Sequence, residues 1–191
     1  PVLRRVDYPL PSAEQLVRVG WPKGADRLAR AVLAVNLHFG ALDFADGHAV
    51  SYDSLRLREY HHVFPDALLQ EGGITNSYLA LNCALVTWKT NRSIGRKDPL
   101  AYLRDRVEWT DEDTVQHRLR THLLDYKCLS NATYEDNGKP LQGAALAERL
   151  RPDFERFLAH RAALVAAASA SFAQGRHVVL EQLLQEVGAA G

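Results

Sequence analysis

Residues 55 to 99 read LRLREYHHVFPDALLQEGGITNSYLALNCALVTWKTNRSIGRKDP, and this stretch decides the fold. We expect a short strand over Arg56 to His62, because apolar and polar side chains alternate there and a proline follows. A second strand is expected over Cys83 to Trp88, an apolar run with high strand propensity. Asp66 to Gln70 has the length of one or two helical turns, and a further helix is expected to start at Lys89. The sequence therefore predicts the order strand, loop, strand, helix.

Four polar side chains stand at the ends of these elements. His61 and His62 close the first strand, Asn82 opens the second, and Asn91 lies at the start of the helix. This order, with the runs HHVFP and WKTNRSIGRKDPLAYL, resembles the HNH nucleases of the ββα-metal type. It is most similar to the nuclease domain at the C-terminal end of GmrSD-like restriction proteins. The SspE-type defence proteins, which respond to phosphorothioate-modified DNA, share this architecture.

The resemblance implies a role for each of these side chains. His62 would be the general base that takes a proton from the attacking water, a task that suits neutral imidazole near pH 7. His61 and Asn91 would hold a divalent cation, Mg²⁺ or Mn²⁺, which neutralises charge on the scissile phosphate. Asn82 would hold His62 in place through backbone contacts, with Asn76 as the alternative. Many HNH domains have an aspartate where this chain has His61, which changes the metal preference.

A cluster of basic side chains flanks the proposed site. Between positions 89 and 106 there are six basic residues against two acidic ones, although the net charge of the whole chain is zero. Contact with DNA phosphates is therefore expected from this local patch. The four nearest to the site are Lys89, Arg92, Arg96 and Lys97. For Arg104 and Arg106, a solvated helix face fits the pattern equally well.

The remainder of the chain is predicted to be helical. Helices are expected over residues 13–19, 26–39, 99–106, 111–124, 142–150, 153–174 and 178–187, with Thr110 as the cap of the fourth and Pro152 at the start of the sixth. Leu28, Val32, Val35 and Phe39 form the expected apolar stripe of the second helix. Residues 129–140 are expected to form a polar loop. The fold class is thus α+β and mostly α-helical, with flanking helices around a small ββα core.

Length and composition fit one nuclease domain. The 191 residues, 47% hydrophobic and 24% charged, are divided into N-terminal helices (1–45), the HNH core (46–106) and a C-terminal helical part (107–191). The start at Pro1 and the lack of methionine suggest a piece of a longer protein. No apolar run approaches the roughly 20 residues of a membrane span. Cys83 and Cys128 are too few for a disulfide framework, and neither has a partner at metal-binding spacing, so reduced thiols in a bacterial cytoplasm are expected.

The resemblance to HNH nucleases implies a metal-dependent endonuclease or nickase that acts on double-stranded phage DNA. By the same resemblance, the chain would be the C-terminal effector of a restriction-type defence protein. Its partner would be an N-terminal nucleotide-hydrolysing sensor domain of the same polypeptide. Two alternatives stay open: a non-catalytic DNA-binding or assembly module with a decayed core, and an RNA-directed nuclease on the same core. Homo-oligomer formation is also left open by the sequence.

Overall fold

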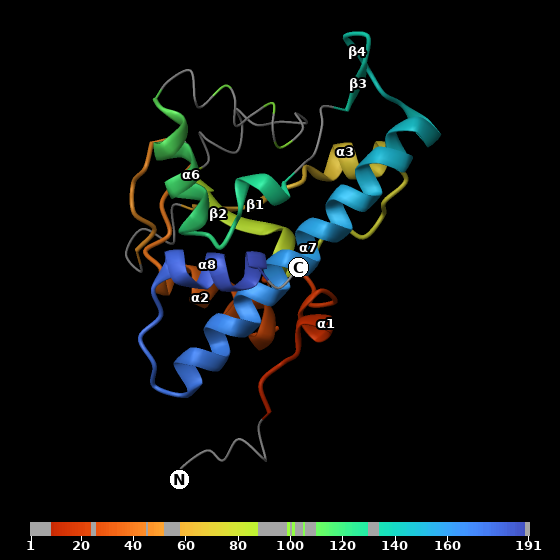
Figure 1. Ribbon diagram of the computed structural model, residues 1–191. Helices are drawn as coiled ribbons and strands as arrows, with labels where there is room; N and C mark the ends of the chain where they lie inside the picture. The colour runs from red at the N-terminus through yellow and green to blue at the C-terminus, as the bar shows by residue number, and fades with distance from the viewer. Residues whose placement is uncertain are drawn as a thin grey trace.

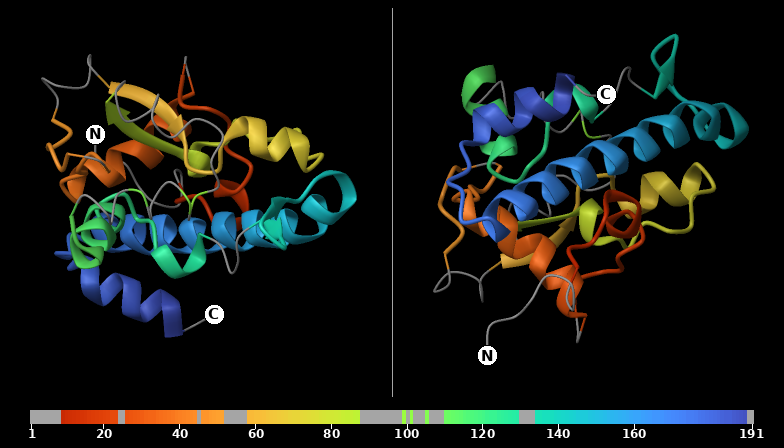
Figure 2. Two further views of the ribbon diagram at one scale, coloured as in Figure 1. Left: turned by 90° about the horizontal axis from the view of Figure 1, so that it is seen from above. Right: turned by 60° about the horizontal axis from the view of Figure 1, so that its bottom comes forward.

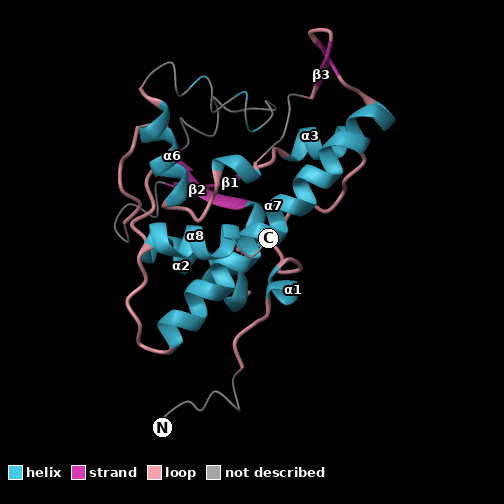
Figure 3. Ribbon diagram, in the orientation of Figure 1, coloured by secondary structure: helices cyan, strands magenta, loops and turns pink. Residues whose placement is uncertain are grey.

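The computed structural model describes residues 9–23, 26–44, 46–51, 58–87, 99, 101, 105, 110–129 and 134–189. The described chain is mostly α-helical, with two small two-stranded antiparallel sheets (Figures 1 and 3). The expected α+β fold class is therefore confirmed. None of the described helices has both the length and the apolar character that crossing a membrane requires.

The central hairpin is the predicted strand–loop–strand unit. Strand β1 (Arg58–His62) pairs antiparallel with β2 (Cys83–Thr87), so that His62 lies opposite Cys83. The connection holds the short helix α3 (Asp66–Glu71) and the 3₁₀ turn η2 (Ala80–Asn82). The helix expected from Lys89 lies outside the described residues, while three positions of the following predicted helix, at 99, 101 and 105, are helical.

Two capped helices precede the hairpin. Ser12 caps α1 (Ala13–Leu16), and its side chain and that of Gln15 each bond to the backbone of the other. Asp26 caps α2 (Arg27–His38) by accepting a hydrogen bond from the Ala29 backbone at 3.0 Å. Both helices were predicted, and the caps explain why they start where they do.

The buried face of α2 differs from the expected stripe. Val32 is buried as predicted, and Val35 and Phe39 are partly buried against the core. Leu28, however, is exposed, at 36% of its surface. The other fully buried positions are Ala29, Leu33 and Asn36, and the alanine and the asparagine carry no strong hydropathy signal.

The longest element is α7 (Gly143–Ala173), a single helix with Pro152 inside it. The predicted break at Pro152 is therefore wrong. A proline inside a helix removes one backbone hydrogen bond and crowds the preceding turn. Here the helix continues because buried side chains on both sides of the proline, among them Leu150 and Phe154, belong to one hydrophobic core. Figure 2 shows α7 between the β1–β2 hairpin and the last helix, α8 (Leu180–Ala189).

Two further predictions need correction. Helix α6 (Glu112–Arg120) is capped by Asp111, which accepts a hydrogen bond from the Thr114 backbone at 2.8 Å, and not by Thr110. It ends at Arg120 and not near residue 124; the 3₁₀ turn η3 (Tyr126–Cys128) follows.

The expected loop at 129–140 contains a small hairpin. Strands β3 (Glu135–Asp136) and β4 (Lys139–Pro140) flank Asn137-Gly138. These two turn residues have φ of 49° and 74°. Positive φ at both central positions is the signature of a type I′ turn, for which Asn-Gly is the strongest sequence signal.

One hydrophobic core runs through most of the described elements. It includes Leu16 of α1, Phe64 after β1, Leu119 of α6 and Leu183 of α8. Alternate residues of β2 point into this core and into a smaller cluster with Leu33, because successive strand side chains face opposite sides. The hairpin that carries the candidate site is thus packed on both faces.

Candidate active site

Asn82 fixes the turn that follows the two histidines. Its side-chain oxygen accepts a hydrogen bond from the Phe64 backbone at 2.8 Å, and its amide nitrogen donates to the carbonyls of Phe64 at 3.1 Å and Ser77 at 3.0 Å. Asn82 is fully buried. These are the backbone contacts across the loop that we expected of Asn82, whereas Asn76, the alternative, is exposed.

Arg161 of α7 forms hydrogen bonds with the backbone on both sides of Asn82. One guanidinium nitrogen donates to the carbonyls of Leu81 at 2.5 Å and Cys83 at 2.9 Å, on either side of Asn82. Another donates to the carbonyl of His122 at 2.9 Å. Burial lowers the pKa of Arg161 to about 10, so the group stays charged at neutral pH. A long helix is thereby locked to the start of β2.

His62 is the last residue of β1, and the chain bends at the next two positions. Its ring stacks on Trp21, with centroids 4.1 Å apart and planes at 20°. It also makes a T-shaped contact with Tyr78, with centroids 4.7 Å apart and planes at 89°. Burial lowers the pKa of His62, while the nearby Asp66 carboxylate works in the opposite direction. The Nε2 atom is buried and has no hydrogen-bond partner among the described residues. The environment therefore favours neutral imidazole.

Asp66 is the acidic group near His62. It is the first residue of α3, and the Ser77 hydroxyl donates a hydrogen bond to its carboxylate. The Gln70 amide donates to the same oxygen at 3.4 Å. We did not predict Asp66, Trp21 or Tyr78 as site residues, because their proximity to His62 arises only in the folded chain.

His61 lies beside His62 in β1, opposite Ala84, and is 4% exposed. Among the described residues, His61 belongs to no group of three His, Cys, Asp or Glu side chains placed to hold a metal ion. With the His61 imidazole as its one described protein ligand, a divalent ion would leave most coordination positions for water and phosphate oxygens. The second implied ligand, Asn91, and the four phosphate-contacting candidates (Lys89, Arg92, Arg96 and Lys97) lie outside the described residues.

A second group of polar side chains lies away from the hairpin. Asp125, Cys128 and His160 place a carboxylate oxygen, a sulfur and an imidazole nitrogen within 4.8 Å of one another. The sequence offered Cys128 no partner at metal-binding spacing, whereas the fold places two further donor groups near it. Its spacing from Asp125 resembles a ligand pair, but the histidine comes from α7, so that only the fold reveals the group.

Comparison with known proteins gives a short, partial match. A stretch of 69 residues is 33% identical to the uncharacterized protein MJ0686 of Methanocaldococcus jannaschii. The match covers 35% of this chain and 11% of that protein, so the chain spans a small part of its relative's length. No protein family model matches the chain, and no solved structure matches it.

Proposed function

We propose that this chain is a metal-dependent HNH DNA endonuclease or nickase in which His62 is the general base. The observation that carries the proposal is the set of three hydrogen bonds from Asn82 to the backbone that follows the histidine pair. A general base must be held at a fixed distance from its substrate water, and rigid support by neighbouring groups provides this. The order of strand, buried asparagine and strand supports the same assignment.

The environment of His62 is consistent with the base role. An imidazole kept neutral by burial can accept a proton at pH 7. A buried nitrogen without a partner costs free energy, and such a group calls for an explanation. In this proposal the partner is the attacking water, which arrives with the substrate. Tyr78 covers the ring but is 52% exposed, so displacing it uncovers little buried surface.

The remaining parts of the proposal rest on the resemblance. His61 and Asn91 would hold Mg²⁺ or Mn²⁺, which when bound neutralises charge on the phosphate and the leaving oxygen. The basic residues from Lys89 to Lys97 would contact the DNA backbone. The chain would act in the bacterial cytoplasm as the effector of a defence protein, under the control of a nucleotide-hydrolysing domain of the same polypeptide.

A plasmid assay tests the proposal. Supercoiled DNA is incubated with the wild type, with His62→Ala and with His177→Ala, in Mg²⁺, Mn²⁺ or EDTA. His177 is an exposed histidine and serves as the matched control. We expect open circles from the wild type and the control only with metal, and a loss of at least about 100-fold in His62→Ala. Wild-type cleavage by His62→Ala would remove His62 as the base.

Two companion measurements, of DNA binding and of RNA cleavage, test the alternatives. Binding of DNA without cleavage in either metal would favour a decayed, non-catalytic module. Cleavage of a single-stranded RNA substrate in preference to the plasmid would favour an RNA-directed nuclease with the same chemistry.

The metal assignment has a separate test. Asn91→Ala should raise the Mg²⁺ concentration for half-maximal cleavage by about tenfold or more, because a ligand oxygen is lost. An unchanged Mg²⁺ dependence would remove Asn91 from the ligand set.

A further inference from the structure

The group formed by Asp125, Cys128 and His160 has the composition of a transition-metal site. The Cys128 sulfur lies 3.9 Å from the Asp125 Oδ2 atom, and the His160 Nε2 atom lies 3.9 Å from the same oxygen. The backbone N–H of Cys128 donates to the carbonyl of Asp125 at 3.0 Å, so η3 holds these two residues in one tight turn. The histidine approaches from α7, on the other side of the group.

The three donor side chains are partly buried and remain partly accessible to solvent. The side chains of His160 and Asp125 are 15% and 29% exposed, while the His160 Nε2 atom itself is buried. This nitrogen makes no hydrogen bond within the described part of the chain. Two groups that can become anionic thus lie beside a buried imidazole nitrogen, an arrangement that a divalent cation would neutralise and satisfy.

We propose that Asp125, Cys128 and His160 bind a zinc ion. Zinc accepts sulfur, nitrogen and oxygen ligands at about 2.0 to 2.3 Å, whereas Mg²⁺ and Ca²⁺ select oxygen. A tetrahedral ion at these bond lengths separates its donors by about 3.3 to 3.5 Å. The two 3.9 Å separations from the Asp125 oxygen therefore need to close by a few tenths of an ångström. All three donor atoms lie within 4.8 Å of one another, so small side-chain adjustments would complete the site. On binding, Cys128 releases its thiol proton to solvent and coordinates as the thiolate.

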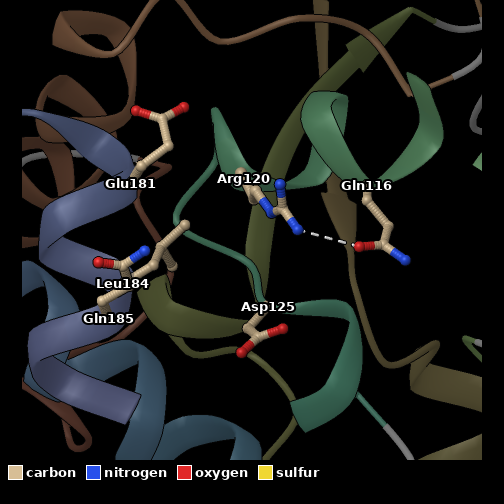
Figure 4. Close-up of a pocket in the computed structure, with 6 residues that line it drawn as sticks. All are labelled: Gln116, Arg120, Asp125, Glu181, Leu184 and Gln185. Carbon is tan, nitrogen blue, oxygen red and sulfur yellow. Dashed lines mark hydrogen bonds between the residues drawn. The ribbon is translucent and has the colours of Figure 1, made fainter. Parts of the chain in front are cut away.

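One member of the group, Asp125, also lines a cavity of about 250 Å³. Figure 4 shows Asp125 in this cavity together with Arg120 and Gln116, which are joined by a hydrogen bond of 3.0 Å. Three protein ligands would leave the fourth tetrahedral position to water. The metal would join η3 to α7 one residue before Arg161, and so would stabilise the helix that holds the start of β2.

This site is independent of the proposed nuclease activity, so its test uses spectroscopy. Purified protein is stripped with a chelator, then titrated with Co²⁺, a zinc substitute whose bond to a thiolate gives a near-ultraviolet charge-transfer band. We expect one equivalent of Co²⁺ to produce the band and Zn²⁺ to abolish it by displacement. Zn²⁺ should also raise the melting temperature of the wild type. Absence of the band, or of any Zn²⁺ effect on melting, in the wild type would overturn the proposal.

Near-isosteric variants locate the site. Cys128→Ser should lose the band and His160→Gln should weaken Co²⁺ binding at least about tenfold, with circular dichroism showing that each variant is folded. Cys83→Ala is the matched cysteine control and should keep the band, because Cys83 is fully buried in β2. His61→Ala should also keep it, which separates this site from the HNH core. A band that survives Cys128→Ser, or disappears in Cys83→Ala, would contradict the assignment.

Discussion

At the scale of single residues, Asn82 is the side chain on which the local structure depends most. Truncation in Asn82→Ala leaves the N–H and carbonyl of Phe64 and the carbonyl of Ser77 without the hydrogen bonds that they now make. Unsatisfied buried groups cost about 1 to 3 kcal/mol each, with partial relief by relaxation. We expect the free energy of unfolding to fall by about 2 to 4 kcal/mol in urea titrations. The exposed Asn76→Ala is the control and should change it by less than about 0.5 kcal/mol. Equal effects would contradict this role.

The His62 pKa depends on its aromatic neighbours. Trp21→Ala removes the ring that stacks on the imidazole, so solvent should reach it and the lowered pKa should rise toward its ordinary value. An NMR titration of the His62 ring protons in EDTA, in the wild type and in Trp21→Ala, measures this change. A His62 pKa that stays lowered in Trp21→Ala would show that residues other than Trp21 keep the imidazole away from solvent.

The same shift has a consequence for stability. Because folded His62 binds a proton less readily than the unfolded chain does, stability should increase with pH between the lowered pKa and about 6.5. This contribution is lost as the pH falls through that window. The pH dependence should be weaker in Trp21→Ala, as urea unfolding at a series of pH values would show.

The two cysteines should differ in reactivity. Burial raises the pKa of Cys83 to about 12, so almost no thiolate is present at pH 8. We expect an alkylating reagent to label Cys128 in the native protein and both cysteines after unfolding, as peptide mass spectrometry would detect. Native labelling of Cys83 would contradict its burial.

At the scale of elements, the sequence predicted those parts whose determinants are local. The strands β1 and β2 were predicted from alternation and from an apolar run, respectively, and Ser12 was predicted as the cap of its helix. Asp26, expected as the first residue of the second helix, is its cap. Errors occurred where distant packing overrides a local signal, as in the helix that continues through Pro152. The predicted cap Thr110 is another such error, because the next residue, Asp111, is the actual N-cap of α6. Local propensity cannot rank such alternatives without the tertiary contacts.

Helix α7 contains an internal proline, Pro152, at an exposed position where core packing does not require this residue type. Pro152 is exposed and lies nine positions after the first residue of the helix. Alanine would restore a backbone donor and remove the ring, gains that exceed the loss of proline's restriction of the unfolded chain. We expect Pro152→Ala to raise the free energy of unfolding by about 1 to 2 kcal/mol in urea titrations. Destabilisation would mean that a kink at this position is needed to seat both halves of α7 on the core.

At the scale of the whole molecule, the candidate sites are made by contacts between segments far apart in the sequence. Arg161 reaches Leu81, and His160 reaches Asp125, from neighbouring positions of one helix. Neither contact has a signature in the sequence, because a helical residue does not specify which distant backbone it will meet. The histidine pair and Asn82 could be predicted from the resemblance, whereas their structural support and the zinc-type group could not.

Substitutions of Arg161 test how much these contacts between distant segments contribute to stability. Its guanidinium joins the start of β2 to the chain segment after α6, through the carbonyls of Leu81, Cys83 and His122. Arg161→Met keeps much of the volume but leaves these buried carbonyls without their present donor. Removing one partner of a buried charged interaction typically costs about 3 to 5 kcal/mol. We expect a loss of about 2 to 4 kcal/mol, since methionine also avoids the burial of a charge.

The companion variant Arg161→Lys distinguishes charge from geometry. Lysine keeps the positive charge but places one ammonium group where the planar guanidinium reaches three carbonyls from two nitrogens. If geometry is decisive, urea unfolding should show Arg161→Lys to be nearly as unstable as Arg161→Met. Arg156→Lys is the control, because Arg156 is a partly exposed arginine of the same helix. Wild-type stability in Arg161→Lys would show that the charge alone holds α7 to the hairpin, and that the fork geometry of Arg161 is not required.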